Sequence, residues 1–133
     1  MNYVRIHTGP DGRSQLADER WPLQEGDFTP PSPGGYFITP LVGANDALMM
    51  HHPPGYRDAW HTAPAPVLGV VLRGQVRIET SDGDKRLLGP GDQFVAMDLT
   101  GDGHLMEAAD SEAYDLALVL LKDRLPAAAG AGQ

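Results

Sequence analysis

The chain has 133 residues, close to the usual size of one domain, and 41% of them are hydrophobic, which is enough for a buried core. Its formal net charge of −8 argues against nucleic-acid and anionic-membrane binding, because Lys and Arg are what hold phosphate groups. The absence of Cys excludes disulfides and thiolate metal sites, and no apolar run approaches the ~20 residues of a membrane span or forms a signal peptide. We therefore expect a cytoplasmic protein.

The N-terminal part of the chain is expected to contribute one strand and an arm. Tyr3–Ile6 reads as a short strand, and the Gly and Pro residues of Thr8–Arg13 predict a turn. Gln15–Asp27 is polar with a few apolar residues and is interpreted as irregular. Phe28–Gly35 is rich in Pro, which lacks the backbone N–H that a central strand needs, so we expect this segment to lie extended on the rest of the domain.

From residue 36 onward, short apolar or alternating segments separated by turn residues predict a succession of β-strands. The segments are Tyr36–Val42, Ala47–His52, Trp60–Ala63, Val67–Leu72, Val76–Thr80, Arg86–Leu88, Gln93–Met97, His104–Ala108 and Tyr114–Leu121. Together with the first strand they make about ten, and many short strands with tight turns are typical of a sandwich or barrel. We predict one all-β domain over 1–125, with an arm at 1–35, a barrel at 36–125 and a flexible tail at 126–133.

Val67–Leu72 is apolar on both faces. Val67 and Val71 lie on one face, and Leu68 and Leu72 lie on the other. A strand of this kind is covered on both sides, whereas a small barrel covers only its inner side. The outer side therefore needs the arm or a second subunit, which favours a homodimer.

Two histidines, His61 and His104, lie far apart in the sequence on either side of the central strands. Because side chains alternate along a strand, Ala59, His61 and Ala63 should share one face, and we expect both imidazoles to enter one cavity. They could be metal ligands, an acid/base pair suited to proton transfer near neutral pH, or barrel histidines with structural hydrogen bonds. Asp98, six residues before His104, could orient an imidazole.

Other residues are candidates for the lining of this cavity. His51 and His52 point to opposite faces, so at most one enters the interior, and His52 is a candidate for an additional metal ligand. Glu107 has the opposite strand parity to His104 and should point away from the cavity, and Trp60 should likewise pack outside. The expected apolar lining residues are Tyr36, Phe94 and Met106.

The stretch Trp60–Glu107 resembles the cupin superfamily, whose fold is a small jelly-roll barrel, or double-stranded β-helix. The first motif of that family has two histidines one residue apart, then a glutamate and a glycine. Here His61 matches, Ala63 and Val67 replace the second His and the Glu, and the glycine is Gly74. The second motif matches at Gly89–Asp92, with His104 as its histidine.

The resemblance implies a divalent metal such as Zn, Ni, Fe or Mn, but His61 and His104 alone form an incomplete ligand set. It also implies a small-molecule ligand in the barrel interior. We therefore predict a small-molecule-binding protein that acts through His61 and His104 as a metal-dependent or acid/base enzyme of the isomerase, cyclase or lyase type. The alternative is a non-catalytic binding or sensor barrel that has lost its metal.

Overall fold

The computed structural model describes residues 1–26 and 34–122 of the chain, and all of its regular elements are β-strands. In chain order they are β1 (Asn2–Thr8), β2 (Ser14–Arg20), β3 (Gln24–Glu25), β4 (Phe37–Ile38), β5 (Ala44–His52), β6 (Val67–Arg73), β7 (Val76–Thr80), β8 (Lys85–Leu88), β9 (Gln93–Ala96), β10 (His104–Ala108) and β11 (Tyr114–Leu121). The predicted all-β class is confirmed. Within the described residues no helix is long and apolar enough to cross a membrane.

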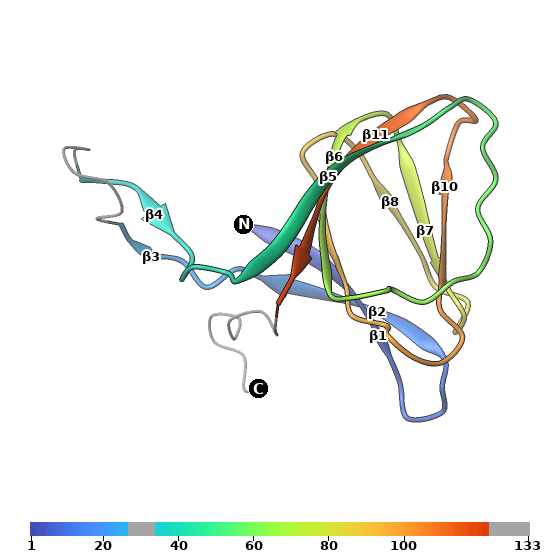
Figure 1. Ribbon diagram of the computed structural model, residues 1–133, viewed down its shortest axis with the longest axis horizontal. Helices are drawn as coiled ribbons and strands as arrows, with labels where there is room; N and C mark the ends of the chain where they lie inside the picture. Colours follow the sequence, from blue (N-terminus) through green and yellow to red (C-terminus); the bar gives the residue numbers. More distant parts are fainter. Residues whose placement is uncertain (27–33, 123–133) are drawn as a thin grey trace.

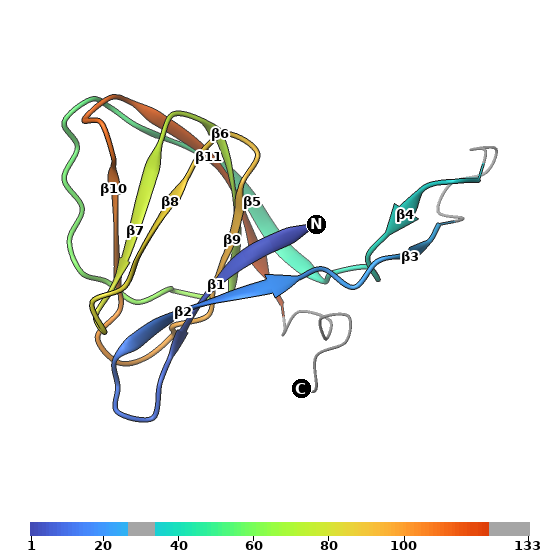
Figure 2. The same cartoon turned by 180° about the vertical axis from the view of Figure 1, so that it is seen from behind.

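Two facing sheets enclose the interior of the domain (Figures 1 and 2). The larger has six strands in the order β2-β1-β9-β6-β11-β5, and the smaller has three in the order β10-β7-β8. All neighbours pair antiparallel except β1 and β9, which are parallel. The larger sheet therefore combines strands from the two ends of the chain, and β2 and β5 are its edges.

The expectation of an irregular segment at Gln15–Asp27 is wrong for its first part. Ser14–Arg20 is a strand, β2, that pairs along its whole length with β1. The polar composition misled the prediction because β2 is an edge strand with only Ser14 fully buried, so backbone pairing holds it in place without an apolar pattern. The first 20 residues thus belong to the main sheet.

The predicted strand at Tyr36–Val42 is reduced to the two residues of β4. β4 pairs with β3, and this two-stranded ribbon stands away from the rest of the molecule in both ribbon views (Figures 1 and 2). Pro40 ends the strand, since it cannot donate to a ladder. Most of Phe28–Gly35 and the whole predicted tail at 126–133 lie outside the described residues.

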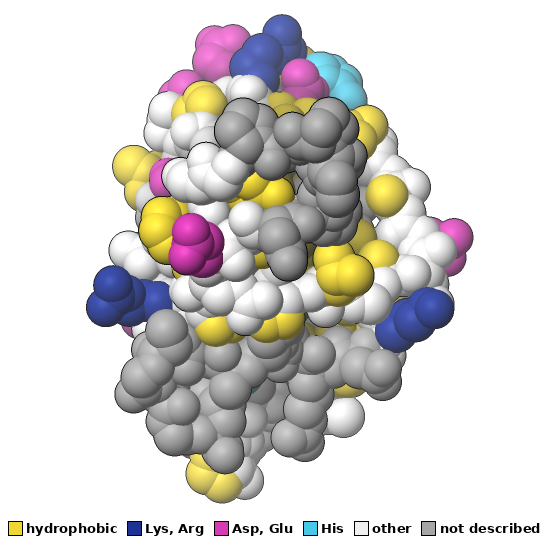
Figure 3. Space-filling model, turned by 90° about the vertical axis from the view of Figure 1, so that its left-hand side faces the viewer, with side chains coloured by type: hydrophobic (Ala, Val, Ile, Leu, Met, Phe, Trp, Pro, Cys, Tyr) yellow, Lys and Arg dark blue, Asp and Glu magenta, His cyan; other side chains and the backbone are white. Residues whose placement is uncertain are grey.

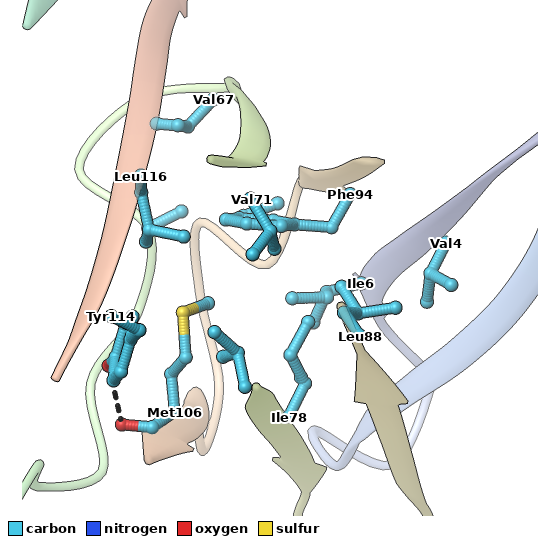
Figure 4. Packing of buried hydrophobic residues seen from close by; sticks show 13 residues of the cluster. Val4, Ile6, Val67, Val71, Ile78, Leu88, Phe94, Met106, Tyr114 and Leu116 are labelled. Atoms are coloured by element: carbon cyan, nitrogen blue, oxygen red, sulfur yellow. Dashed lines mark hydrogen bonds between the residues drawn. The ribbon is translucent and has the colours of Figure 1, made fainter. Parts of the chain in front are cut away.

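The core lies between the two sheets (Figure 4). One continuous cluster of buried side chains comes from both: Val4 and Ile6 from β1, Val67 and Val71 from β6, Phe94 from β9, Leu116 from β11, Ile78 from β7, Leu88 from β8 and Met106 from β10. Strand alternation explains the pattern, because residues two apart on each strand point inward. Burial of each large apolar side chain contributes about 1.5–3 kcal/mol, so this cluster is the main stabilising feature.

Residues 53–66 connect β5 to β6 without forming a strand, so the predicted strand at Trp60–Ala63 is wrong. The segment makes only an isolated antiparallel bridge, between His61 and His104. Pro64 and Pro66 follow within a few residues and remove the N–H groups that a longer ladder would need. In Figure 1 this connection runs along the outside of β10 before it turns to β6.

Candidate functional site

A cavity of about 280 Å³ lies in the interior, bounded by the inner face of the larger sheet, by β10 and by the 53–66 connection. Most of its lining is apolar: Leu48, Met50, Tyr56, Ala63, Pro64, Val67, Phe94, Ala96, Met106, Leu116, Leu118 and Leu120. Four polar residues complete it: His52, Asp58, His61 and His104. The volume is near the lower end of the range for small-molecule sites, and a few polar groups in an apolar cavity are typical of such sites.

His104 opens β10 and is nearly fully buried. Its Nδ1 lies 2.7 Å from Oδ2 of Asp98, a residue with no exposed surface. An ionised carboxylate can only accept a hydrogen bond, so this contact places the imidazole proton on Nδ1. The Nε2 lone pair is then free for a molecule in the cavity, and the structure places Asp98 where the sequence interpretation expected an orienting carboxylate.

His61 lies beside His104, with the two ring centroids 4.6 Å apart. The backbone holds the pair together, since His61 N donates to His104 O at 3.1 Å and His104 N donates to His61 O at 2.8 Å. The Nδ1 of His61 lies 2.7 Å from the carbonyl oxygen of Ala59, which again fixes the proton on Nδ1. Both histidines therefore have Nδ1 engaged, although the His61 side chain is 47% exposed and that of His104 only 5%.

Gly103 makes this close approach possible. It has φ of +78°, and a Cβ atom there would lie 2.3 Å from the backbone carbon and oxygen of His61. Only glycine combines this backbone conformation with that little space. Gly103 therefore both turns the chain into His104 and admits the backbone of His61.

Asp58 is a site residue that the sequence interpretation missed. Its Oδ2 accepts from Met106 N at 3.0 Å and lies 3.6 Å from Nδ1 of His61, while its Oδ1 accepts from Ala59 N at 2.9 Å. Asp58 thus ties the 53–66 connection to β10 and places a carboxylate beside the second imidazole. Its position three residues before His61 was the available signal, but a spacing alone does not show that a loop folds back.

Ser14 is a second missed residue, and it supports the site from outside the cavity. It is fully buried, and its hydroxyl donates to the carbonyl oxygen of Gly103 at 2.6 Å and accepts from Ser81 N at 2.8 Å. These bonds connect β2 and the turn after β7 to the residue immediately before His104. Ser14 lay between the predicted turn at Thr8–Arg13 and the segment Gln15–Asp27 that was interpreted as irregular, so no sequence pattern pointed to it.

His52 lines the cavity at the end of β5, so it is the member of the His51–His52 pair that faces inward. Its ring stacks on Tyr56 with centroids 4.3 Å apart and lies 4.4 Å from the ring of Tyr114. Burial among these rings lowers the pKa of His52 below its ordinary value, with Asp58 opposing the shift. Burial also raises the pKa of Tyr114, so that residue stays a neutral phenol.

The remaining candidate residues differ in whether they line the cavity. Phe94 and Met106 line the cavity. Tyr36 does not: it belongs to the β3–β4 ribbon, where a side chain at Gly26 would collide with its ring. Glu107 points away from the cavity, as its parity predicted, and forms an ion pair with Arg77 at 3.3 Å. Trp60 is about half exposed and is not part of the cavity lining.

The residues do not fit a resident metal ion. Ala63 and Val67, which replace two ligands of the cupin motif, both line the cavity, so apolar side chains occupy the space where ligands would stand. Among the described residues no group of three or more His, Cys, Asp or Glu side chains could hold a metal ion, so His52 does not complete the set. A catalytic metal needs about three protein ligands, and this site offers two.

The strand order and the interior cavity define the class: an all-β jelly-roll barrel. No protein-family model and no curated protein sequence matches the chain. Similar solved structures include a conserved protein of unknown function from Streptococcus pyogenes (22% identity, TM-score 0.47), with 59% of this chain and 64% of that chain covered. A protein from Neisseria meningitidis is also similar (15% identity, TM-score 0.47), and the match covers 78% of this chain and 87% of that chain. The match to FeII HppE (17% identity, TM-score 0.48) covers 87% of this chain and 60% of that chain. The chain thus spans less than two thirds of the streptococcal protein and of HppE.

Proposed function

We propose that the protein is a metal-independent enzyme that moves a proton on a small, largely apolar molecule bound in the cavity. The observation that carries the proposal is the buried Asp98–His104 pair, in which Asp98 holds Nδ1 of His104 and the imidazole lines the cavity beside His61. A neutral imidazole oriented by a carboxylate is a common general base, and proton transfer of this kind contributes about 10²–10⁴-fold to a rate.

The neighbouring carboxylates support the two charge states that such a reaction needs. When Nε2 of His104 accepts a proton, Asp98 stabilises the imidazolium, and Asp58 is placed to do the same for His61. Two imidazoles whose ring centroids are 4.6 Å apart can act on one bound molecule if one starts neutral and the other protonated, so that the neutral ring removes a proton and the imidazolium returns one. This arrangement suits an isomerisation or an elimination, in which no atoms other than protons are exchanged with the protein.

The energetics of Asp98 also support a functional role. Its Oδ1 is buried and has no hydrogen-bond partner among the described residues. A buried carboxylate oxygen without a partner is unfavourable by about 1–3 kcal/mol, so a protein selected only for stability would gain by losing it. The cost is understandable if the negative charge is needed beside His104.

The cavity indicates the class of substrate. Leu48, Leu118 and Leu120 line one part of it, whereas the polar residues gather along β10, the 53–66 connection and the end of β5. A molecule with an apolar body and one polar group carrying an acidic C–H bond, such as an apolar ketone, aldehyde or thioester, would match this division.

Solvent deuterium incorporation tests the proposal. A panel of small apolar carbonyl compounds is incubated in D₂O with chelator-treated protein, and exchange at the carbon next to the carbonyl is followed by NMR. We expect exchange with at least one compound, and a loss of about 10²-fold or more in His104→Gln, which cannot act as a base. Asp98→Asn should also slow exchange, because an amide favours the other tautomer of His104.

The matched control is Glu107→Gln, which changes a carboxylate on the same strand that faces away from the cavity and should leave exchange unchanged. If His104→Gln exchanges deuterium as fast as the wild-type protein, the imidazole is not the base. If exchange appears only after a divalent metal is added, the metal-independent mechanism is wrong.

A non-catalytic binding barrel is the second candidate, and the apolar residues Ala63 and Val67 at the ligand positions favour it. Under this alternative a compound of the panel binds, as measured by calorimetry, but no compound undergoes exchange. His104→Gln would then weaken binding without any rate to lose.

A further inference from the structure

The cavity has four polar residues in an apolar lining, and one of them, His52, has no part in the proton transfer proposed above. His61 and His104 are the acid/base pair, and Asp58 lies beside His61. On the side of the molecule from which the β3–β4 ribbon projects, hydrophobic side chains surround the ribbon and Lys and Arg lie toward the margins (Figure 3), but neither strand of the ribbon contributes a residue to the cavity lining. The polar group of a small molecule is therefore met by the polar residues of the cavity.

A carbonyl oxygen in this cavity needs a hydrogen-bond donor, because removal of a proton from the neighbouring carbon moves negative charge to that oxygen. Asp58 cannot be the donor, since an ionised carboxylate only accepts. Its two oxygens already accept from Met106 N at 3.0 Å and from Ala59 N at 2.9 Å. Outside the acid/base pair, the described lining of the cavity offers two side-chain donors, the His52 ring and the Tyr56 hydroxyl.

His52 is the more firmly held of these two donors. It ends β5 and lies opposite Tyr114 of β11 in the strand register. Its ring stacks on Tyr56 with centroids 4.3 Å apart and an interplanar angle of 23°, and it lies 4.4 Å from the ring of Tyr114. Tyr56, in contrast, belongs to the 53–66 connection and is 39% exposed. A donor fixed in advance needs no rearrangement when charge develops on its acceptor, so His52 is the better placed.

The surroundings of His52 also indicate which ring nitrogen carries its proton. Burial lowers the pKa of His52, so the ring is neutral near pH 7 and has a single N–H group. Nδ1 is buried and has no hydrogen-bond partner among the described residues. A buried N–H without an acceptor is rare in proteins, so the proton belongs on Nε2.

We propose that His52 forms the subsite for the carbonyl oxygen of the substrate, to which its Nε2–H donates a hydrogen bond. The inference rests on the proposed function, in which His104 is the base. The C–H bond next to the carbonyl breaks, its proton moves to Nε2 of His104, and the electron pair forms a C=C bond while the carbonyl oxygen becomes an oxyanion. The hydrogen bond from His52 strengthens as this charge develops, and no proton leaves His52.

Deuterium exchange into cyclohexanone, used as the probe in D₂O, measures the catalytic consequence. His52→Phe keeps a ring in the stack but has no donor, so kcat for exchange should fall about 10²–10³-fold with a much smaller change in KM. His52→Gln, whose amide keeps an N–H group, should exchange faster than His52→Phe. Tyr56→Phe should cost far less than His52→Phe. Urea unfolding checks that each variant is folded.

The matched control is His51→Phe, the neighbouring residue of β5, which faces away from the cavity beside Asp115 and should leave exchange unchanged. Nitrogen NMR of the wild-type protein provides a readout that does not depend on turnover. Nε2 of His52 should carry the ring proton, and its resonance should move when cyclohexanone binds. His52→Phe identifies that resonance by removing it.

The two measurements distinguish failure of the subsite from failure of the proposed function. Exchange that is lost in His104→Gln but unchanged in His52→Phe overturns the subsite and leaves the base in place. A proton found on Nδ1 of His52, or a loss in Tyr56→Phe as large as that in His52→Phe, also overturns it. If cyclohexanone moves the His52 resonance but is not exchanged, the subsite stands and the proton transfer is wrong. If it is neither exchanged nor moves that resonance, both are wrong.

Discussion

His52 lies at the end of the cavity in an environment that disfavours its charged form. Its ring is packed against Tyr56 and Tyr114, and its Nδ1 is buried without a partner among the described residues. Desolvation of the imidazolium is the main reason that its pKa is lowered, and the nearby His51 adds to the effect while Asp58 opposes it. His52 is therefore neutral at physiological pH and contributes an uncharged ring to the cavity wall.

This lowered pKa makes a prediction about stability. In the unfolded chain His52 takes up a proton near pH ~6.5, whereas in the folded protein it does so only at lower pH. Below about pH 6.5 the unfolded state therefore binds more protons, and the free energy of unfolding falls as the pH is lowered toward the folded-state pKa. His52→Phe keeps a ring in the stack but cannot titrate, so its stability relative to the wild type should improve between about pH 7.5 and about pH 5.

Urea unfolding of both proteins at several pH values measures this difference, and an NMR titration of the His52 ring gives its pKa directly. His51→Phe serves as the comparison, because His51 lies on the exposed face of β5 beside Asp115. A constant difference between His52→Phe and the wild type across this range would contradict the argument.

At the scale of the elements, the contact between the 53–66 connection and β10 depends on one glycine, Gly103. A methyl group at Gly103 would press on the backbone of His61 and Thr62, which cannot move aside as the end of a flexible side chain can. Gly103→Ala should therefore break the bridge that holds His61 against His104. We expect a loss of about 1–2 kcal/mol from the positive φ and about 1–3 kcal/mol more from the collision.

Gly83→Ala separates the two contributions. Gly83 also has a positive φ, of +91°, but a Cβ there meets nothing within 4 Å, so only the backbone strain should appear. Urea unfolding gives the two stabilities, and nuclear Overhauser contacts between the rings of His61 and His104 report the bridge. If Gly103→Ala is no less stable than Gly83→Ala and keeps those contacts, the bridge does not depend on the glycine.

The elements that the sequence predicted well are those in which the apolar pattern and the burial agree. Val76–Thr80, His104–Ala108 and Tyr114–Leu121 have the predicted bounds, because their inward residues are apolar and turn residues flank them. The pattern failed where tertiary contacts decide the structure. β2 is held by backbone pairing at an edge, and the segment around His61 lies where Asp58 and Gly103 place it, although its composition resembles a strand.

The candidate site follows the same rule at the scale of residues. A motif resemblance and spacing were enough to bring His61, His104 and Asp98 together, since all three flank strands whose order the turns define. Asp58 and Ser14 were missed because each acts through a contact between segments distant in the sequence, with Met106 and with Gly103 respectively. Tyr36 was misplaced because the ribbon that carries it leaves the barrel.

At the scale of the whole molecule, net charge and apolar surface act against each other. Every copy of the chain carries a charge of −8, and the homodimer predicted from the sequence would meet through the uncharged outward residues of β6, Leu68 and Leu72. In the predicted homodimer the favourable contacts are apolar, while the long-range interaction between the copies is repulsive. This combination has an opposite salt dependence from an association that charge pairs hold together.

The dimer should therefore become tighter as salt is added. Raising NaCl from about 20 mM to about 500 mM shortens the range of electrostatic interactions several-fold, which screens the repulsion between the copies and lowers the Kd. Glu112→Lys, at an exposed position in the turn before β11, changes the net charge from −8 to −6 (−8 + 2) and should both tighten the dimer at low salt and reduce its salt dependence. Sedimentation equilibrium at each salt concentration gives the Kd values. A Kd that rises with salt would mean that complementary charges, and not the apolar residues of β6, hold the two copies together.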